Sequence, residues 1–74
     1  MWQIVRITKK ANKDNRTYES IVFLNSLKEC EKWIREHFSS EDYRTAQHFH
    51  NGVRFKSHTF MESYVYCEIK TRLQ

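Results

Sequence analysis

Residues 43–56 read YRTAQHFHNGVRFK, and apolar and polar side chains alternate through them on both sides of Asn51-Gly52. Successive side chains of a β-strand point to opposite faces of its sheet. A turn at Asn51-Gly52 would therefore give a hairpin with two unlike faces. One face takes Tyr43, Thr45, Gln47, Phe49, Val53 and Phe55. The other takes Arg44, Ala46, His48, His50, Arg54, Lys56 and His58. The pattern predicts a half-buried sheet.

The length of the loop decides whether the two faces stay separate. A three-residue loop, His50-Asn51-Gly52, sets Phe49 opposite Val53 and Gln47 opposite Phe55. Glycine would take a left-handed conformation there at little cost. A two-residue Asn-Gly turn would pair Phe49 with Arg54 and mix the faces. We therefore expect the three-residue loop.

A final strand, expected over residues 63–73, repeats the division between apolar and cationic positions. One set contains Val65, Cys67, Ile69 and Leu73. The other contains Tyr64, Tyr66, Glu68, Lys70 and Arg72. We expect the first set to lie in the core and the second to share an exposed, basic face with Arg54 and Lys56.

The first half of the chain predicts two strands and a helix. Residues 2–8 and 17–24 are rich in β-branched and aromatic residues, which predicts strands. The pattern does not decide which of their side chains face the core. Ser26 followed by Glu29 is a capping box that opens a helix. Its apolar stripe contains Leu27, Cys30, Ile34 and Phe38. A second short helix from Ser40 is an alternative, but the alternation from Tyr43 favours a strand.

The predicted order is β-β-α-β-β-β. The fold class is α+β, with one antiparallel sheet and a single helix packed on one face. At 74 residues the chain, 1–74, should form a single domain. No apolar run approaches the length of a membrane span, and no signal peptide is recognisable, so we expect a soluble intracellular protein.

Composition argues against an enzyme and favours an anionic partner. The formal net charge is +4. One glycine cannot form a glycine-rich phosphate loop, and no nucleophile or paired-carboxylate motif is present. The metal-ligand types are His37, His48, His50, His58, Cys30 and Cys67, without CxxC or HxxxH spacing. We expect no catalysis, no metal and no cofactor. The lysine-rich segment 9–16 reads equally well as a binding arm or as an ordinary loop.

Several features of the chain together resemble a small anti-CRISPR family that phages direct against type I-F surveillance complexes. They are its size and strand order, Ser26-Leu27 opening the helix, the Asn51-Gly52 hairpin, and Val65 and Cys67 in the last strand. The resemblance implies docking on the complex subunits that hold the guide RNA, obstruction of target DNA, and non-specific binding of duplex DNA. By position, Lys32 matches a basic contact residue in the middle of the family's helix. Phe38 departs from the polar residue that the family has at the helix end, and residues 69–74 extend beyond its pattern.

We therefore expect a small phage or mobile-element inhibitor that binds a host CRISPR surveillance complex in the host cytoplasm and blocks target DNA access. The alternative is a direct, non-specific regulator that binds DNA or RNA. A self-assembling protein is a third possibility, with Trp2 and Phe60 as its apolar contacts. Monomer and dimer both remain open. The predicted contact residues are Lys32, Arg35, Arg44, Arg54, Lys56, Tyr64, Tyr66, Lys70 and Arg72.

Overall fold

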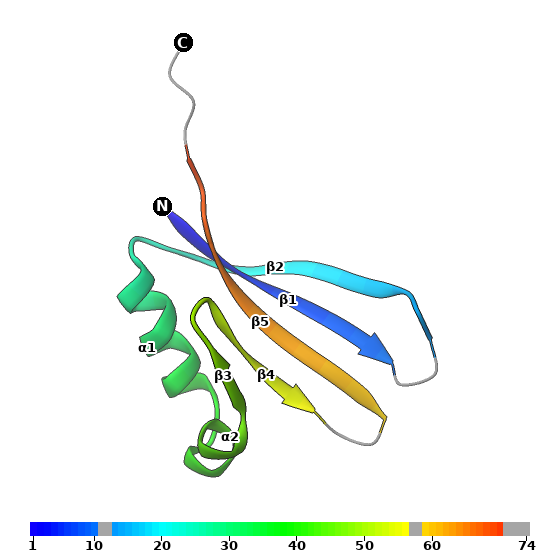
Figure 1. The fold of residues 1–74 in the computed structure, drawn as a ribbon. Coiled ribbons are helices and arrows are strands. Elements are labelled where there is room, and N and C mark those ends of the chain that lie inside the picture. Colours follow the sequence, from blue (N-terminus) through cyan, green and yellow to red (C-terminus); the bar gives the residue numbers. More distant parts are fainter. Residues whose placement is uncertain (11–12, 57–58, 71–74) are drawn as a thin grey trace.

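The computed structural model describes residues 1–10, 13–56 and 59–70, which form one five-stranded antiparallel sheet and two helices (Figure 1). The strands are β1 (Trp2–Lys10), β2 (Arg16–Leu24), β3 (Gln47–Phe49), β4 (Gly52–Lys56) and β5 (Phe60–Glu68). They lie in the order β2-β1-β5-β4-β3. The helices are α1 (Leu27–His37) and α2 (Ser40–Thr45). The α+β class with one antiparallel sheet is confirmed, whereas the prediction of a single helix is wrong.

The burial of Ile4 shows which side chains of β1 face the core, and a β-bulge in β2 shows which side chains of β2 do so. Ile4 of β1 lies opposite Val22, and the next residue, Val5, lies opposite Ser20, so that Ile21 is the extra residue. Ile4 is fully buried, and Ile21 and Val22 both pack against the core. Because side chains alternate, Val5 and Ile7 point to the sheet face opposite Ile4.

Helix α1 forms as the sequence predicts. The Ser26 Oγ accepts a hydrogen bond from the Glu29 backbone amide at 3.2 Å, and the Glu29 carboxylate accepts one from the Asn25 amide at 3.2 Å. Cys30 and Ile34, on the predicted stripe, are fully buried. The helix lies beside the end of the sheet where β1 begins and β5 ends (Figure 1).

Residues 40–45 form α2 and Ala46 is its C-cap, so the strand predicted from Tyr43 is wrong over its first four residues. The Ser39 Oγ accepts a hydrogen bond from the Asp42 amide at 3.1 Å and caps the helix. The Arg44 guanidinium binds both carboxylate oxygens of Glu41 at 2.8 Å. These local contacts outweigh the alternation of Tyr43 and Thr45, and the strand begins only at Gln47.

The hairpin between β3 and β4 has a two-residue loop, His50-Asn51, so the predicted three-residue loop is wrong. Phe49 pairs with Gly52, and Gln47 pairs with Arg54. Gly52 does not have a positive φ. An added Cβ at Gly52 would lie 2.2 Å from the carbonyl oxygen of Tyr64 in β5. The close approach of β5, rather than turn geometry, therefore requires glycine here.

Tyr64 and Tyr66 lie in the core, which corrects their predicted exposure. Their exposed fractions are 4% and 7%, and they pack with the core set Ile4, Cys30, Ile34 and Val53. Val65 and Cys67, predicted to be inside, lie on the opposite face and are half-buried. A tyrosine ring buries more apolar area than valine or cysteine, so the rings occupy the space beneath α1.

Candidate functional site

Within the described part of the chain, one face of the sheet carries no helix, and we call it the open face. Strand alternation and the pairing register assign its members from β2 to β3. They are Arg16, Tyr18, Ser20, Phe23, Gln3, Val5, Ile7, Lys9, Met61, Ser63, Val65, Cys67, Gly52, Arg54, Lys56, Gln47 and Phe49. None of them belongs to the core cluster beneath α1.

The open face carries charge of one sign. It holds Lys9, Arg16, Arg54 and Lys56. All nine acidic residues of the chain lie elsewhere: on the helices, on the helix side of β2 and β5, and at Asp14 between β1 and β2. Lys9 lies directly opposite Arg16, an arrangement of like charges that destabilises a sheet. A solvated face usually mixes the two signs, so this segregation is unusual for a face that contacts water alone.

The centre of the open face is apolar. Val5 and Ile7 of β1 and Val65 and Cys67 of β5 are all half-buried although no helix covers them. An antiparallel sheet with one wet face normally carries polar residues at such positions. The open face therefore combines cations with a surface that water solvates poorly.

Three aromatic rings stand at the two edges of the open face. Tyr18 and Phe23 of β2 are 64% and 58% exposed, and Phe49 of β3 is 43% exposed. The Arg54 guanidinium carbon lies 4.9 Å from the Phe49 ring centroid, and its Nε donates a hydrogen bond to the Ser63 Oγ at 3.3 Å. These contacts hold the half-buried Arg54 side chain against the sheet.

The helix side of the sheet has the opposite character. Beyond the core, Arg6 pairs with Glu19, whose hydrogen bond raises the pKa of Arg6. The Tyr64 hydroxyl donates to Glu62 at 2.9 Å, and burial together with this bond raises the pKa of Tyr64. Signs are mixed here, as expected of a solvated surface.

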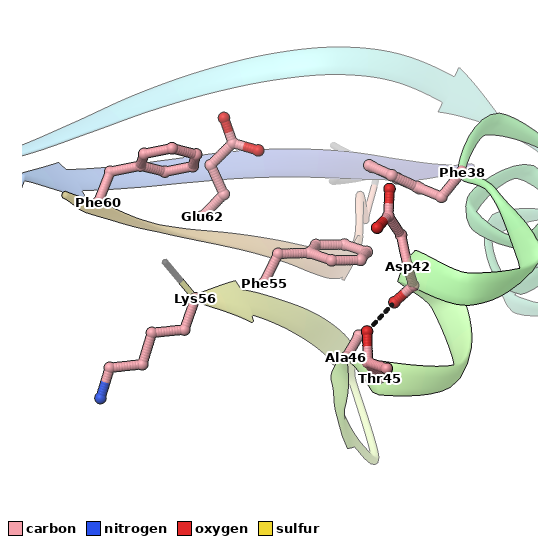
Figure 2. Close-up of a pocket in the computed structure, with 8 residues that line it drawn as sticks. All are labelled: Phe38, Asp42, Thr45, Ala46, Phe55, Lys56, Phe60 and Glu62. Atoms are coloured by element: carbon pink, nitrogen blue, oxygen red, sulfur yellow. Dashed lines mark hydrogen bonds between the residues drawn. The ribbon is translucent and has the colours of Figure 1, made fainter. Parts of the chain in front are cut away.

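Asp42 and Glu62 line a pocket of about 290 Å³ on this helix side, between α2 and the strands β4 and β5. Three phenylalanines, Phe38, Phe55 and Phe60, also line it. Figure 2 shows the two carboxylates on either side of the Phe55 ring, with the Lys56 ammonium group pointing away from both. Lys56 thus contributes its charge to the open face and the acids do not.

The predicted contact residues fall in separate parts of the molecule. Arg54 and Lys56 lie on the open face, whereas Lys32 and Arg35 are exposed on α1 and Arg44 on α2 pairs with Glu41. Tyr64 and Tyr66 are buried and Lys70 follows the end of β5, so these three are not part of the face; Arg72 lies outside the described residues.

Sequence reasoning missed the contribution of β1 and β2 to the open face. Arg16 and Tyr18 join it because the bulge at Ile21 sets the facing of β2, and Lys9 joins it because it alternates with the buried Ile4 along β1. The run Ile21–Leu24 is apolar on both parities, so alternation alone gives no facing. The available signal was the pair of cations on either side of the β1–β2 connection.

The chain matches no family model, no curated protein and no solved structure. Within residues 1–10, 13–56 and 59–70, no group of three potential metal ligands comes together. The same part of the chain contains no helix long and apolar enough to cross a membrane.

Proposed function

We propose that this protein binds nucleic acid through the open face of its sheet. The observation that carries the proposal is the presence of four cations and no acid on a face whose centre is apolar. Lysine and arginine neutralise phosphates and release their counterions, which favours binding. The described residues of the open face include no acid and no histidine that could act as a base on its serines or on Cys67, so the proposed role is binding without catalysis.

Salt dependence tests the proposal, because each phosphate contact contributes about −0.7 to −0.9 to the slope of log K against log salt concentration. Four contacts predict a slope of roughly −3. Fluorescence anisotropy of a labelled oligonucleotide, measured between low and moderate salt, gives this slope directly. Binding that does not weaken with salt would contradict phosphate recognition.

A matched pair of variants locates the surface. Lys56→Gln removes an exposed lysine from the open face, and Lys32→Gln removes an exposed lysine from α1. Both change the net charge equally. Lys56→Gln should reduce the slope by about 0.7–0.9, whereas Lys32→Gln should leave it unchanged. If Lys32→Gln has the same effect as Lys56→Gln, the open face is not the binding surface.

The family resemblance adds a narrower proposal, in which the bound nucleic acid belongs to a host CRISPR surveillance complex whose target access is blocked. What supports it is the exposure of Lys32 and Arg35 on the layer opposite the open face, where a protein subunit could dock at the same time. Under this proposal Lys32→Gln impairs inhibition of target binding by a purified type I-F complex without weakening oligonucleotide binding. If inhibition is unchanged, α1 is not the docking surface that the resemblance implies.

A further inference from the structure

The register places three of the four cations of the open face, Arg16, Lys9 and Lys56, in a row. Lys9 lies opposite Arg16 on one side and Met61 on the other, and Met61 lies opposite Lys56. The row therefore crosses β2, β1, β5 and β4, over roughly 14 Å at ordinary strand spacing. It lies at the end of the sheet where β1 and β4 finish (Figure 1), and Arg54 lies two residues further in along β4.

Next to this row lies the apolar centre, bordered by the exposed rings. Val5 and Ile7 of β1 lie beside Val65 of β5, and Tyr18 lies directly opposite Ile7. Phe49 extends the apolar centre at the other edge, because it pairs with Gly52, which pairs in turn with Val65. Cations at one end, aliphatic side chains in the middle and rings at the two edges make the face amphipathic.

Resting on the proposed function, we infer that the ligand of the open face is an unpaired nucleic-acid strand. A duplex stacks its bases inside and offers mainly phosphates, so it would leave the apolar centre uncovered or place it against charge. An unpaired strand offers phosphates to the cationic row and base faces to Tyr18, Phe49 and the aliphatic side chains between them. The extent of the sheet suits a site on the order of four nucleotides.

The charge pattern argues against a second copy as the occupant. Two open faces packed together would bring eight cations into one interface without any compensating acid on either face. An acidic protein would satisfy the cations, but it would give the exposed rings no stacking partner. A single strand satisfies both chemistries with one ligand.

The test compares a labelled twelve-nucleotide oligothymidine with a twelve-base-pair duplex by fluorescence anisotropy at one fixed salt concentration. The single strand should bind at least tenfold more tightly. Tyr18→Ser and Phe49→Ser should each weaken single-strand binding roughly fivefold or more, because base stacking is lost, and should leave duplex binding unchanged. Phe60→Ser, on the helix side, is the aromatic control and should leave both affinities unchanged. Thermal melts establish that each variant is folded.

The outcomes separate this inference from the proposed function. If both probes bind equally and the ring variants have no effect while Lys56→Gln still reduces the salt slope, the unpaired-strand inference fails and the proposed function stands. If neither probe binds even at low salt, both fail. If light scattering shows a dimer that Tyr18→Ser dissociates, the open face is a self-association surface and the inference is overturned.

Discussion

Gly52→Ala should destabilise the fold strongly, although glycine-to-alanine changes in strands usually stabilise slightly. The added Cβ would lie 2.2 Å from the Tyr64 carbonyl oxygen and 3.1 Å from the Val65 Cα. Both obstructing atoms are backbone, so β5 must move by about 1 Å to reach ordinary contact distance. Overpacking typically costs about 1–3 kcal/mol of folding stability, and the rigid backbone of β5 places Gly52→Ala at the upper end of this range, about 3 kcal/mol. In a domain of this size that loss corresponds to a melting temperature lower by roughly 12–24 °C.

Urea or thermal unfolding followed by circular dichroism measures the effect. Gln47→Ala, exposed in the same hairpin, is the control and should change stability by less than about 0.5 kcal/mol. Gly52→Asn separates two explanations, because asparagine tolerates a left-handed conformation better than alanine does. If the close approach of β5 is the reason for glycine, Gly52→Asn should destabilise the fold at least as much as Gly52→Ala. An Ala variant as stable as the natural protein, or an Asn variant that is better than Ala, would refute the reasoning.

Two further predictions concern the facing of β5. Burial, with a smaller contribution from Glu31, raises the pKa of Tyr66 to about 12, whereas an unfolded tyrosine titrates near 10. Between these values the unfolded chain loses a proton that the native protein keeps, so stability should fall with pH by up to about 1.4 kcal/mol per unit. Tyr66→Phe should flatten this fall in urea unfolding, and an unchanged fall would contradict the burial of Tyr66. Separately, a thiol reagent should modify Cys67 of the native protein before Cys30, which is fully buried and whose pKa burial raises. The fast phase of thiol modification should therefore disappear in Cys67→Ser and remain in Cys30→Ser. The reverse result would place Cys67, instead of Cys30, beneath the helix.

Local signals predicted α1 well and the later strands less well. Ser26, Glu29 and the stripe through Cys30 and Ile34 define α1 within its own residues, so no distant contact is needed to place it. Ser39 and Asp42 carry the same kind of signal for α2, but the alternation that begins at Tyr43 concealed it. Residues 43–45 belong to both patterns, and the capping hydrogen bond of Ser39 favours the helix.

The facing of β5 could not be read from its own sequence. Tyr64 and Tyr66 alternate with Val65 and Cys67, and every one of these side chains has apolar surface. The choice depends on Val53, which pairs with Tyr64, and on the depth of the space beneath α1. The polar hydroxyl of tyrosine favours an exposed position, whereas the large apolar area of its ring favours a buried one. In β5 the ring area outweighs the hydroxyl, and both tyrosines are buried.

The burial of the large rings beneath α1 also explains why the centre of the open face is apolar. Once the large rings and Ile4 fill the space beneath α1, the smaller Val5, Ile7, Val65 and Cys67 are left on the other side of the same strands. A face meant only for water would carry polar residues there and could mix charges, as the helix side does around Arg6 and Glu19. The paired like charges of Lys9 and Arg16 weaken the sheet slightly, and an anion bound across them removes that cost. Ligand binding should therefore stabilise the fold as well as occupy the face.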